Sequence, residues 1–347
     1  MWNRRRFLAT SAAVALAPRA FAQQPAQSES AQPAPTQPTQ LPFIDSHVHV
    51  WKTDPAFPFA AGVHPSPADA SVEMLQDLMH ANNVSRTVLI QVIHYKWDNS
   101  YLASVLKRFP SQFHGVCRVN PEDPAAPDQL SHLTEVQGFR GVRLSPAAGP
   151  AGDWIAGPLM PPLWRRCAQL KVPMTLLIPV TRLPQIHPLL EANPDLQVVI
   201  DHMADCPLDQ PAQLDLLLAL ARYPHVFVKI SHMWSLSSQP YPYPDAQAQV
   251  REICSLFGAN RLMAGTDWPI SLPKQSYAQT VALYRDHTGY LPPGSAAFGN
   301  QGPSGIVTGS GPGQAWLNDP YKPGAVSPSA IRAILSGTVQ QVWPFSL

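Results

Sequence analysis

Three histidines and one aspartate occupy positions that could form a hydrolytic site. His47 and His49 are one residue apart in Asp45-Ser46-His47-Val48-His49. In a strand, residues i and i+2 point to the same face, so we expect both imidazoles to converge, with Asp45 one step below on that face. Two converging imidazoles are a good start for a zinc-type site.

Two further polar residues follow later apolar runs. His202 lies in Val199-Ile200-Asp201-His202-Met203, and Asp267 in Ala264-Gly265-Thr266-Asp267-Trp268-Pro269. Ester hydrolysis at neutral pH needs an activated water and an electrophile for the developing oxyanion. A carboxylate near an imidazole pair can serve the first need, and a cation or protonated histidine the second. His47, His49, His202 and Asp267 therefore form one candidate set.

The elements that must position these residues recur along the chain. Eight short apolar runs are predicted as buried strands: 43–50, 87–92, 113–119, 139–144, 173–178, 197–200, 226–230 and 262–264. Between most of them lie helix-like stretches: 71–81, 101–108, 129–135, 159–170, 183–192, 214–221 and 246–257. Runs apolar on both faces that alternate with helices indicate parallel strands. The pattern predicts an α/β chain folded as a single-domain (β/α)8 TIM barrel, whose reactive groups lie at the carboxyl ends of the strands. An open doubly wound sheet is the alternative, although the chain has no G-x-G-x-x-G or P-loop motif.

The N-terminal segment predicts export. Residues 1–22 combine Arg4-Arg5-Arg6-Phe7-Leu8, a short apolar run and Ala20-Phe21-Ala22, which is typical of a twin-arginine signal peptide. The apolar run is shorter than the roughly 20 residues of a spanning helix, so we expect no stable membrane anchor after cleavage and a periplasmic location. Residues 23–40 are predicted as a disordered linker and 41–347 as the folded domain, with a Gly- and Pro-rich insertion around 289–324.

The amino-acid composition limits the classes of molecule that the chain could bind. The chain has 347 residues and a formal net charge of +1, with no basic cluster outside the N-terminus. A nucleic-acid binder would carry a basic stripe, so we expect a small-molecule substrate. The four cysteines show no disulfide framework and are predicted as buried thiols. The oligomeric state is left open.

The segments around these residues resemble the amidohydrolase superfamily, in particular its amidohydrolase-related branch of lactonases and decarboxylases. The resemblance rests on Ile44-Asp45-Ser46-His47-Val48-His49, Val199-Ile200-Asp201-His202-Met203 and Gly265-Thr266-Asp267-Trp268-Pro269. Ala333-Ile334-Leu335-Ser336-Gly337-Thr338 is similar to the closing helix of that branch. The resemblance as a whole covers roughly residues 41–344, apart from the Gly-rich insertion.

The resemblance implies roles for the four residues. His47 and His49 match the first-strand metal ligands. His202 matches a histidine that binds metal or polarises the substrate carbonyl. Asp267 matches an aspartate that binds metal or acts as general base on the attacking water.

The fifth predicted strand departs from the metal-binding pattern. Many members carry a histidine or a carbamylated lysine at its end, whereas this chain reads Leu177-Ile178-Pro179-Val180-Thr181, and His187 is expected in the following helix. A binuclear centre is therefore not expected. A site with one divalent, zinc-type ion and a metal-free site both remain open, because the dicarboxylate lactonases of this branch work without metal.

Four further residues are assigned to substrate binding. Arg143 ends the fourth predicted strand and resembles the arginine with which lactonases grip a substrate carboxylate; paired hydrogen bonds suit that contact. Gln91 and His94 lie at and after the end of the second strand. His232 follows the seventh strand, where related enzymes often carry a small residue.

Three functions follow from these assignments. The leading hypothesis is a hydrolase that cleaves a small, carboxylate-bearing ester or lactone. The second is a metal-dependent, non-oxidative decarboxylase of an aromatic or muconate-type acid, which the missing fifth-strand ligand disfavours. The third is a non-catalytic periplasmic ligand-binding barrel.

Overall fold

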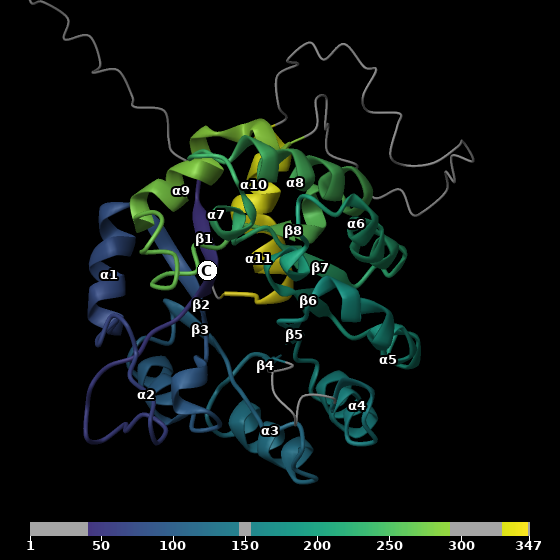
Figure 1. Ribbon diagram of the computed structural model, residues 1–347. Coiled ribbons are helices and arrows are strands. Elements are labelled where there is room, and N and C mark those ends of the chain that lie inside the picture. Colours follow the sequence, from purple (N-terminus) through teal and green to yellow (C-terminus); the bar gives the residue numbers. More distant parts are fainter. Residues whose placement is uncertain (1–40, 146–153, 292–327, 346–347) are drawn as a thin grey trace, which may run out of the picture. The chain divides into compact units, whose positions relative to one another are not determined.

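The computed structural model describes residues 41–145, 154–291 and 328–345 (Figure 1). The chain divides at Gln40, and Leu41 begins one compact unit. The predicted signal peptide, the linker and most of the predicted 289–324 insertion lie outside the described residues.

The described strands are short, buried and parallel. They are β1 (Phe43–Val48), β2 (Val84–Ile90), β3 (Phe113–Val116), β4 (Val142–Leu144), β5 (Met174–Leu176), β6 (Val198–Ile200), β7 (Val226–Lys229) and β8 (Leu262–Met263). They form one sheet in the order β1-β2-β3 and a second in the order β4-β5-β6-β7-β8. Within each sheet, every strand neighbours the next in sequence, unlike a doubly wound sheet, whose strand order reverses at a switch point. The predicted parallel α/β architecture is confirmed.

Backbone contacts connect the edges of the two sheets. Cys117 bridges Val142 beside β3 and β4, and Val48 bridges Trp268 beside β1 and β8, both in parallel. A backbone hydrogen bond supports each connection. Cys117 donates to the carbonyl of Gly141 at 2.9 Å, and Ser46 donates to that of Ala264 at 3.1 Å. The carboxyl ends of β1 and β8 therefore lie side by side.

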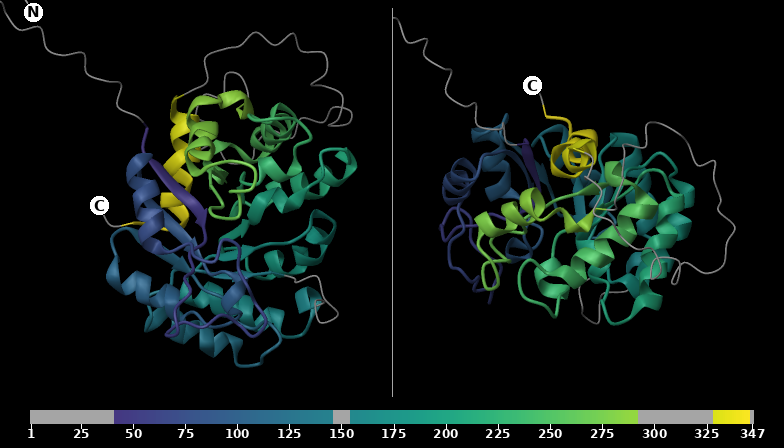
Figure 2. Two further views of the ribbon diagram at one scale, coloured as in Figure 1. Left: turned by 60° about the vertical axis from the view of Figure 1, so that its left-hand side comes forward. Right: turned by 90° about the horizontal axis from the view of Figure 1, so that it is seen from above.

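Helices lie outside the strands in Figures 1 and 2. The longer ones are α1 (Val72–Ala81), α2 (Ser100–Arg108), α3 (Ala126–Glu135), α4 (Met160–Leu170), α5 (His187–Ala192), α6 (Pro211–Leu218), α8 (Pro244–Phe257) and α9 (Tyr277–Asp286). All seven predicted helical stretches are confirmed. Helix α9 was not predicted; its N-cap, Ser276, forms a capping box with Gln279.

The C-terminal helices close the described unit against β1 and β8. Helix α10 (Pro328–Arg332) continues through a π-helical turn (Ala333–Gly337) into α11 (Thr338–Val342). Ala264 donates to the carbonyl of Ile334 at 3.1 Å. The inner side chains of the strands pack with this segment in one apolar cluster: Ile44, Val88, Ile90, Val116, Val199, Phe227, Met263, Val339, Val342, Trp343 and Phe345.

Two further properties concern the described residues as a whole. All four cysteines are buried and free, as predicted. No helix within the described ranges is long and apolar enough to cross a membrane.

Candidate active site

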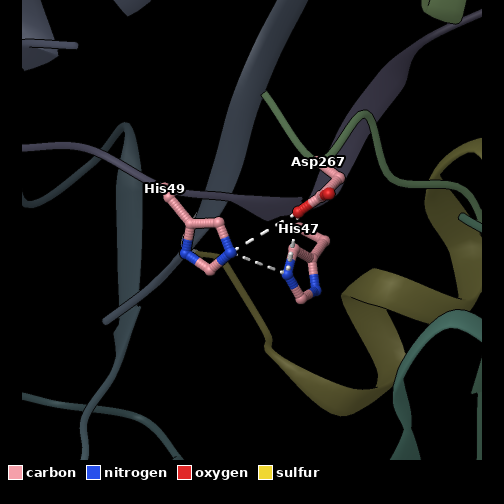
Figure 3. A group of neighbouring side chains, drawn as sticks. All are labelled: His47, His49 and Asp267. Atoms are coloured by element: carbon pink, nitrogen blue, oxygen red, sulfur yellow. Dashed lines mark hydrogen bonds and ion pairs between the residues drawn. The ribbon is translucent and has the colours of Figure 1, made fainter. Parts of the chain in front are cut away.

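Three ligand atoms converge where β1 meets the segment after β8 (Figure 3). His47 Nε2 lies 3.2 Å from His49 Nε2. Asp267 Oδ1 lies 3.4 Å from each of these nitrogens. These distances bring His47, His49 and Asp267 together, as predicted. All three side chains are almost fully buried.

The backbone holds these residues together. Asp267 donates from its N–H to the carbonyl of His47 at 2.8 Å, and His49 donates to that of Trp268 at 2.8 Å. Gly265 permits this approach, because a Cβ built there would lie 2.9 Å from His47 Cβ and 2.9 Å from Ser46 Oγ. A larger residue would push the two segments apart.

Asp45 does not join the group as the sequence suggested. The register of β1 shifts between Asp45 and Val48, so simple alternation fails there. Asp45 accepts from Thr266 N–H at 2.9 Å and from Thr266 Oγ1 at 2.6 Å. Burial raises the pKa of Asp45 to about 6, against these hydrogen bonds. Asp45 thus anchors the segment that carries Asp267.

The tautomer of His49 follows from its partner. His49 Nδ1 lies 2.7 Å from the carbonyl oxygen of Ile90, which can only accept, so Nδ1 carries the proton. The lone pair of His49 Nε2 then faces His47 and Asp267. At metal sites, a backbone carbonyl commonly accepts from the far ring nitrogen of a ligating histidine and fixes the ring in this way.

The three atoms fit one small divalent ion. Tetrahedral zinc with bonds of about 2.0–2.1 Å spaces its ligand atoms by about 3.3 Å. The three separations here are 3.2, 3.4 and 3.4 Å. His202 belongs to two neighbouring groups of potential ligands, one with His47 and Asp201 and one with His232 and Asp267. Three ligands with an open fourth position are typical of a catalytic zinc site.

A buried charge cluster lies directly behind His47. Lys229 Nζ lies 3.1 Å from both Asp201 Oδ1 and His47 Nδ1. Arg143 Nε donates to Asp201 Oδ2 at 2.8 Å. Burial would raise the pKa of Asp201, but Lys229 and Arg143 hold it well below its usual range. The cluster therefore keeps Asp201 ionised beside His47.

His202 and His232 form the other wall of the site. Their rings stack with centroids 3.6 Å apart and planes 9° from parallel. His232 Nε2 lies 2.5 Å from Asp267 Oδ2, and its Nδ1 lies 3.5 Å from Asp205 Oδ1. His202 Nδ1 lies 2.7 Å from Ser231 Oγ, which leaves its Nε2 for a substrate or an ion.

These contacts and burial determine which of the site residues are charged. Burial and then Lys229 lower the pKa of His47 to about 3. Burial acts to lower the pKa of His232, but Asp267 and Asp205 outweigh it and raise that pKa to about 9. Burial would raise the pKa of Asp267, yet His232 holds it well below its usual range. The site pairs an ionised carboxylate with a protonated His232 and a neutral His47.

Three of these residues adopt left-handed backbone conformations, with φ of 53° at His202, 70° at His232 and 54° at Asp267. Such angles cost a residue with a Cβ roughly 1–2 kcal/mol. They persist where the surroundings determine them, commonly at functional sites. Here they turn the side chains at the ends of β6, β7 and β8 toward one another.

The four predicted substrate-binding residues differ in what they contact. His94 lies beside the site: its ring centroid is 4.7 Å from that of Trp51, and burial and then His49 lower its pKa. Gln91 donates its amide to the carbonyl of Asp98, so it holds the connection to α2. Arg143 is buried and uses Nε for Asp201, and His232 contacts Asp267. As expected, His187 lies in α5, away from the group, 2.9 Å from Tyr223 OH.

The sequence interpretation missed three buried charged residues: Lys229, Asp201 and Arg118. Each lies at or near the carboxyl end of an apolar run. A charge at such a place is costly unless it has a partner or a function, and that signal could have identified them.

Comparison with known proteins identifies the family of the chain. The amidohydrolase family model matches residues 44–298. An L-fucono-1,5-lactonase of Burkholderia ambifaria is 29% identical over 242 residues, 66% of this chain and 80% of the relative. A 2-pyrone-4,6-dicarboxylate hydrolase of Comamonas testosteroni is 25% identical over 238 residues, 65% of this chain and 76% of the relative.

Among solved structures, an amidohydrolase of Burkholderia multivorans with bound zinc has a TM-score of 0.64 at 19% identity, covering 88% of this chain and 100% of that one. This likeness supports the fold. Because the family model matches well over half of the chain, the protein is a member of the amidohydrolase family and an enzyme of the hydrolase type.

Proposed function

We propose that this enzyme opens a small, carboxylate-bearing lactone by attack of water at the carboxyl ends of β1 and β8. The observation that carries the proposal is the placement of Asp267: its Oδ1 lies 3.4 Å from both His47 Nε2 and His49 Nε2, while His232 holds its Oδ2. A fixed, ionised carboxylate beside imidazoles suits activation of a water molecule. The L-fuconolactonase and pyrone-dicarboxylate hydrolase relatives support a lactone as the substrate class.

The reaction uses the chain's own groups as follows. Asp267 accepts a proton from water as the water oxygen attacks the lactone carbonyl. His202, with His47, stabilises the oxyanion that develops on the carbonyl oxygen. The ring C–O bond then breaks, and Asp267 returns the proton to the leaving oxygen, which gives a hydroxy acid. Arg143 orients the substrate carboxylate through the guanidinium nitrogens that Asp201 does not engage.

One divalent, zinc-type ion fits His47, His49 and Asp267, with His202 as a fourth candidate ligand. When bound there, such an ion would polarise the carbonyl and make water more acidic. The proposal also takes the eight strands as one closed (β/α)8 barrel, in keeping with the two connections between the sheet edges. It places the enzyme in the periplasm after removal of residues 1–22.

A panel assay tests this proposal. Protein lacking residues 1–22 is mixed with five- and six-membered lactones, with and without a ring carboxylate, and acid release is followed before and after chelator treatment. We expect ring opening, fastest for carboxylated lactones. Folded protein that opens none of them, or that releases carbon dioxide from an aromatic acid instead, would overturn the proposal.

A further inference from the structure

Arg118 is a buried cation that has no carboxylate partner among the described residues. It follows β3 and is 2% exposed. Its Nη1 donates to Ser145 Oγ at 3.1 Å, and its buried Nε has no hydrogen-bond partner. The guanidinium carbon lies 5.3 Å from the centroid of the Trp97 ring. All of these neighbours are uncharged, although burying a charge is costly unless a counter-charge accompanies it.

Arg143, the other buried arginine at this end, already has its carboxylate. Arg143 Nε lies 2.8 Å from Asp201 Oδ2, and Lys229 shares the same aspartate. Arg118 has no such contact, and burial followed by the nearby charge of Arg143 lowers its pKa. Arg118 therefore adds an unbalanced positive charge beside Arg143, at the ends of β3 and β4.

The side chain of Arg118 faces the inner side of the strands. Val116, two residues earlier, belongs to the inner apolar cluster, and residues i and i+2 share a face. The backbone is fixed, since Arg118 N–H donates to Asn99 Oδ1 at 2.9 Å and Asn99 Nδ2 donates to the carbonyl of Arg118 at 2.9 Å. Arg143 also donates from its N–H to the carbonyl of Cys117 at 2.8 Å. Arg118 therefore lies beside Arg143 at the carboxyl ends of the strands, as do His47 and Asp267.

We propose that Arg118 binds a second carboxylate of the substrate, separate from the group that Arg143 orients, so that the preferred lactone is a dianion. The inference rests on the proposed function and adds a specificity-determining residue to it. An incoming carboxylate would accept from Arg118 Nε, a donor that has no partner within the described part of the chain. Trp97 flanks the guanidinium and limits its access to water.

Equilibrium binding of non-reactive acids tests this inference independently of turnover. The probes are the straight-chain dicarboxylates from malonate to adipate, each compared with the monocarboxylate of equal length by titration calorimetry. The wild-type enzyme should prefer at least one dicarboxylate over its matched monocarboxylate. Arg118→Met should weaken binding of that dicarboxylate about 10- to 100-fold, the range for loss of a charged hydrogen bond. The affinity for the monocarboxylate should be nearly unchanged.

Matched variants keep the result interpretable. Arg140→Met removes the same charge from an exposed position just before β4 and should leave both affinities unchanged. Arg118→Lys retains the charge and should recover part of the preference, which guards against a folding defect in Arg118→Met. Equal affinity of folded Arg118→Met for the dicarboxylate, or equal weakening of both acids, would overturn the inference. Absence of lactone turnover in the wild type would instead overturn the proposed function alone.

Discussion

Lys229 Nζ lies 3.1 Å from His47 Nδ1, and both side chains are completely buried. An ammonium group can only donate, so in this contact Nδ1 accepts and His47 Nε2 carries the proton. If His47 Nε2 instead binds an ion, the ring proton must lie on Nδ1, which then donates to Asp201 Oδ1 at 3.3 Å. Lys229 and Asp201 thus offer His47 a partner in either tautomer.

Lys229 should also be essential for stability. Replacement by Met leaves Asp201 with Arg143 as its remaining strong cationic contact, and removal of one member of a buried ion pair costs about 3–5 kcal/mol. We expect Lys229→Met to lower the free energy of unfolding by an amount of that order in urea denaturation. The exposed Lys107→Met is the control and should change it little. An unaltered free energy of unfolding in Lys229→Met would refute the assigned role of this cluster.

Zinc binding should depend on His49 and not on His187. The apo chain, supplied with zinc and dialysed, should retain one equivalent. His49→Ala should weaken the affinity by more than about 100-fold, since loss of a residue that only hydrogen-bonds to a ligand already costs about 10- to 100-fold. His187→Ala should bind as the wild type does, because His187 contacts Tyr223 instead. The readout is metal analysis with competition against a chelator. Failure of the wild type to retain zinc would contradict the fit of the three ligand atoms.

The left-handed backbone at His232 predicts an order of stability for two variants. His232 has φ 70°. Both His232→Gly and His232→Ala lose the contact with Asp267, but only Ala retains a Cβ at this angle. His232→Gly should therefore be the more stable by about 1 kcal/mol, measured by urea denaturation. Both should have reduced turnover, because Asp267 Oδ2 loses its partner. If the Ala variant were equally stable, backbone strain would not be present at this position.

Gly265 should resist even the smallest enlargement. A Cβ there would lie 2.9 Å from His47 Cβ and 3.2 Å from His47 N. Overpacking of this kind typically costs about 1–3 kcal/mol, and here the displacement falls on a candidate ligand. Gly265→Ala should lose stability and turnover together. At Gly337 the nearest atom would be 3.6 Å away, so Gly337→Ala is the matched control. Full activity in Gly265→Ala would show that the close approach is not required.

Much of the fold was readable from the sequence because the strands are apolar on both faces and the helices between them are periodic. Helix α9 escaped prediction because its low amphipathicity gives little pattern, although Ser276 and Gln279 do form a recognisable cap. His47, His49 and Asp267 could be grouped since each follows an apolar run. The contacts of His232 could not be predicted, because they depend on the positive φ angles of His232 and Asp267, which residues with a Cβ rarely adopt.

Asp45 and Lys229 show the limit of pattern-based reasoning. Strand alternation placed Asp45 with the histidines, but an irregular register in β1 directs it to Thr266. Lys229 reads as one polar residue in an apolar strand, and only the tertiary structure reveals Asp201 and His47 around it. Such partners come from other strands, so local sequence cannot identify them.

The role of Asp267 can be tested by one comparison of turnover. Asp267→Asn preserves size, and asparagine tolerates the left-handed φ of 54° better than most residues, so the fold should be retained. Asp205→Asn, which alters the more exposed carboxylate near His232, is the control. In the lactone assay, Asp267→Asn should lower kcat by about 10²- to 10⁴-fold, the usual contribution of a general base, while Asp205→Asn remains active. Retention of wild-type kcat by folded Asp267→Asn would contradict the proposed mechanism.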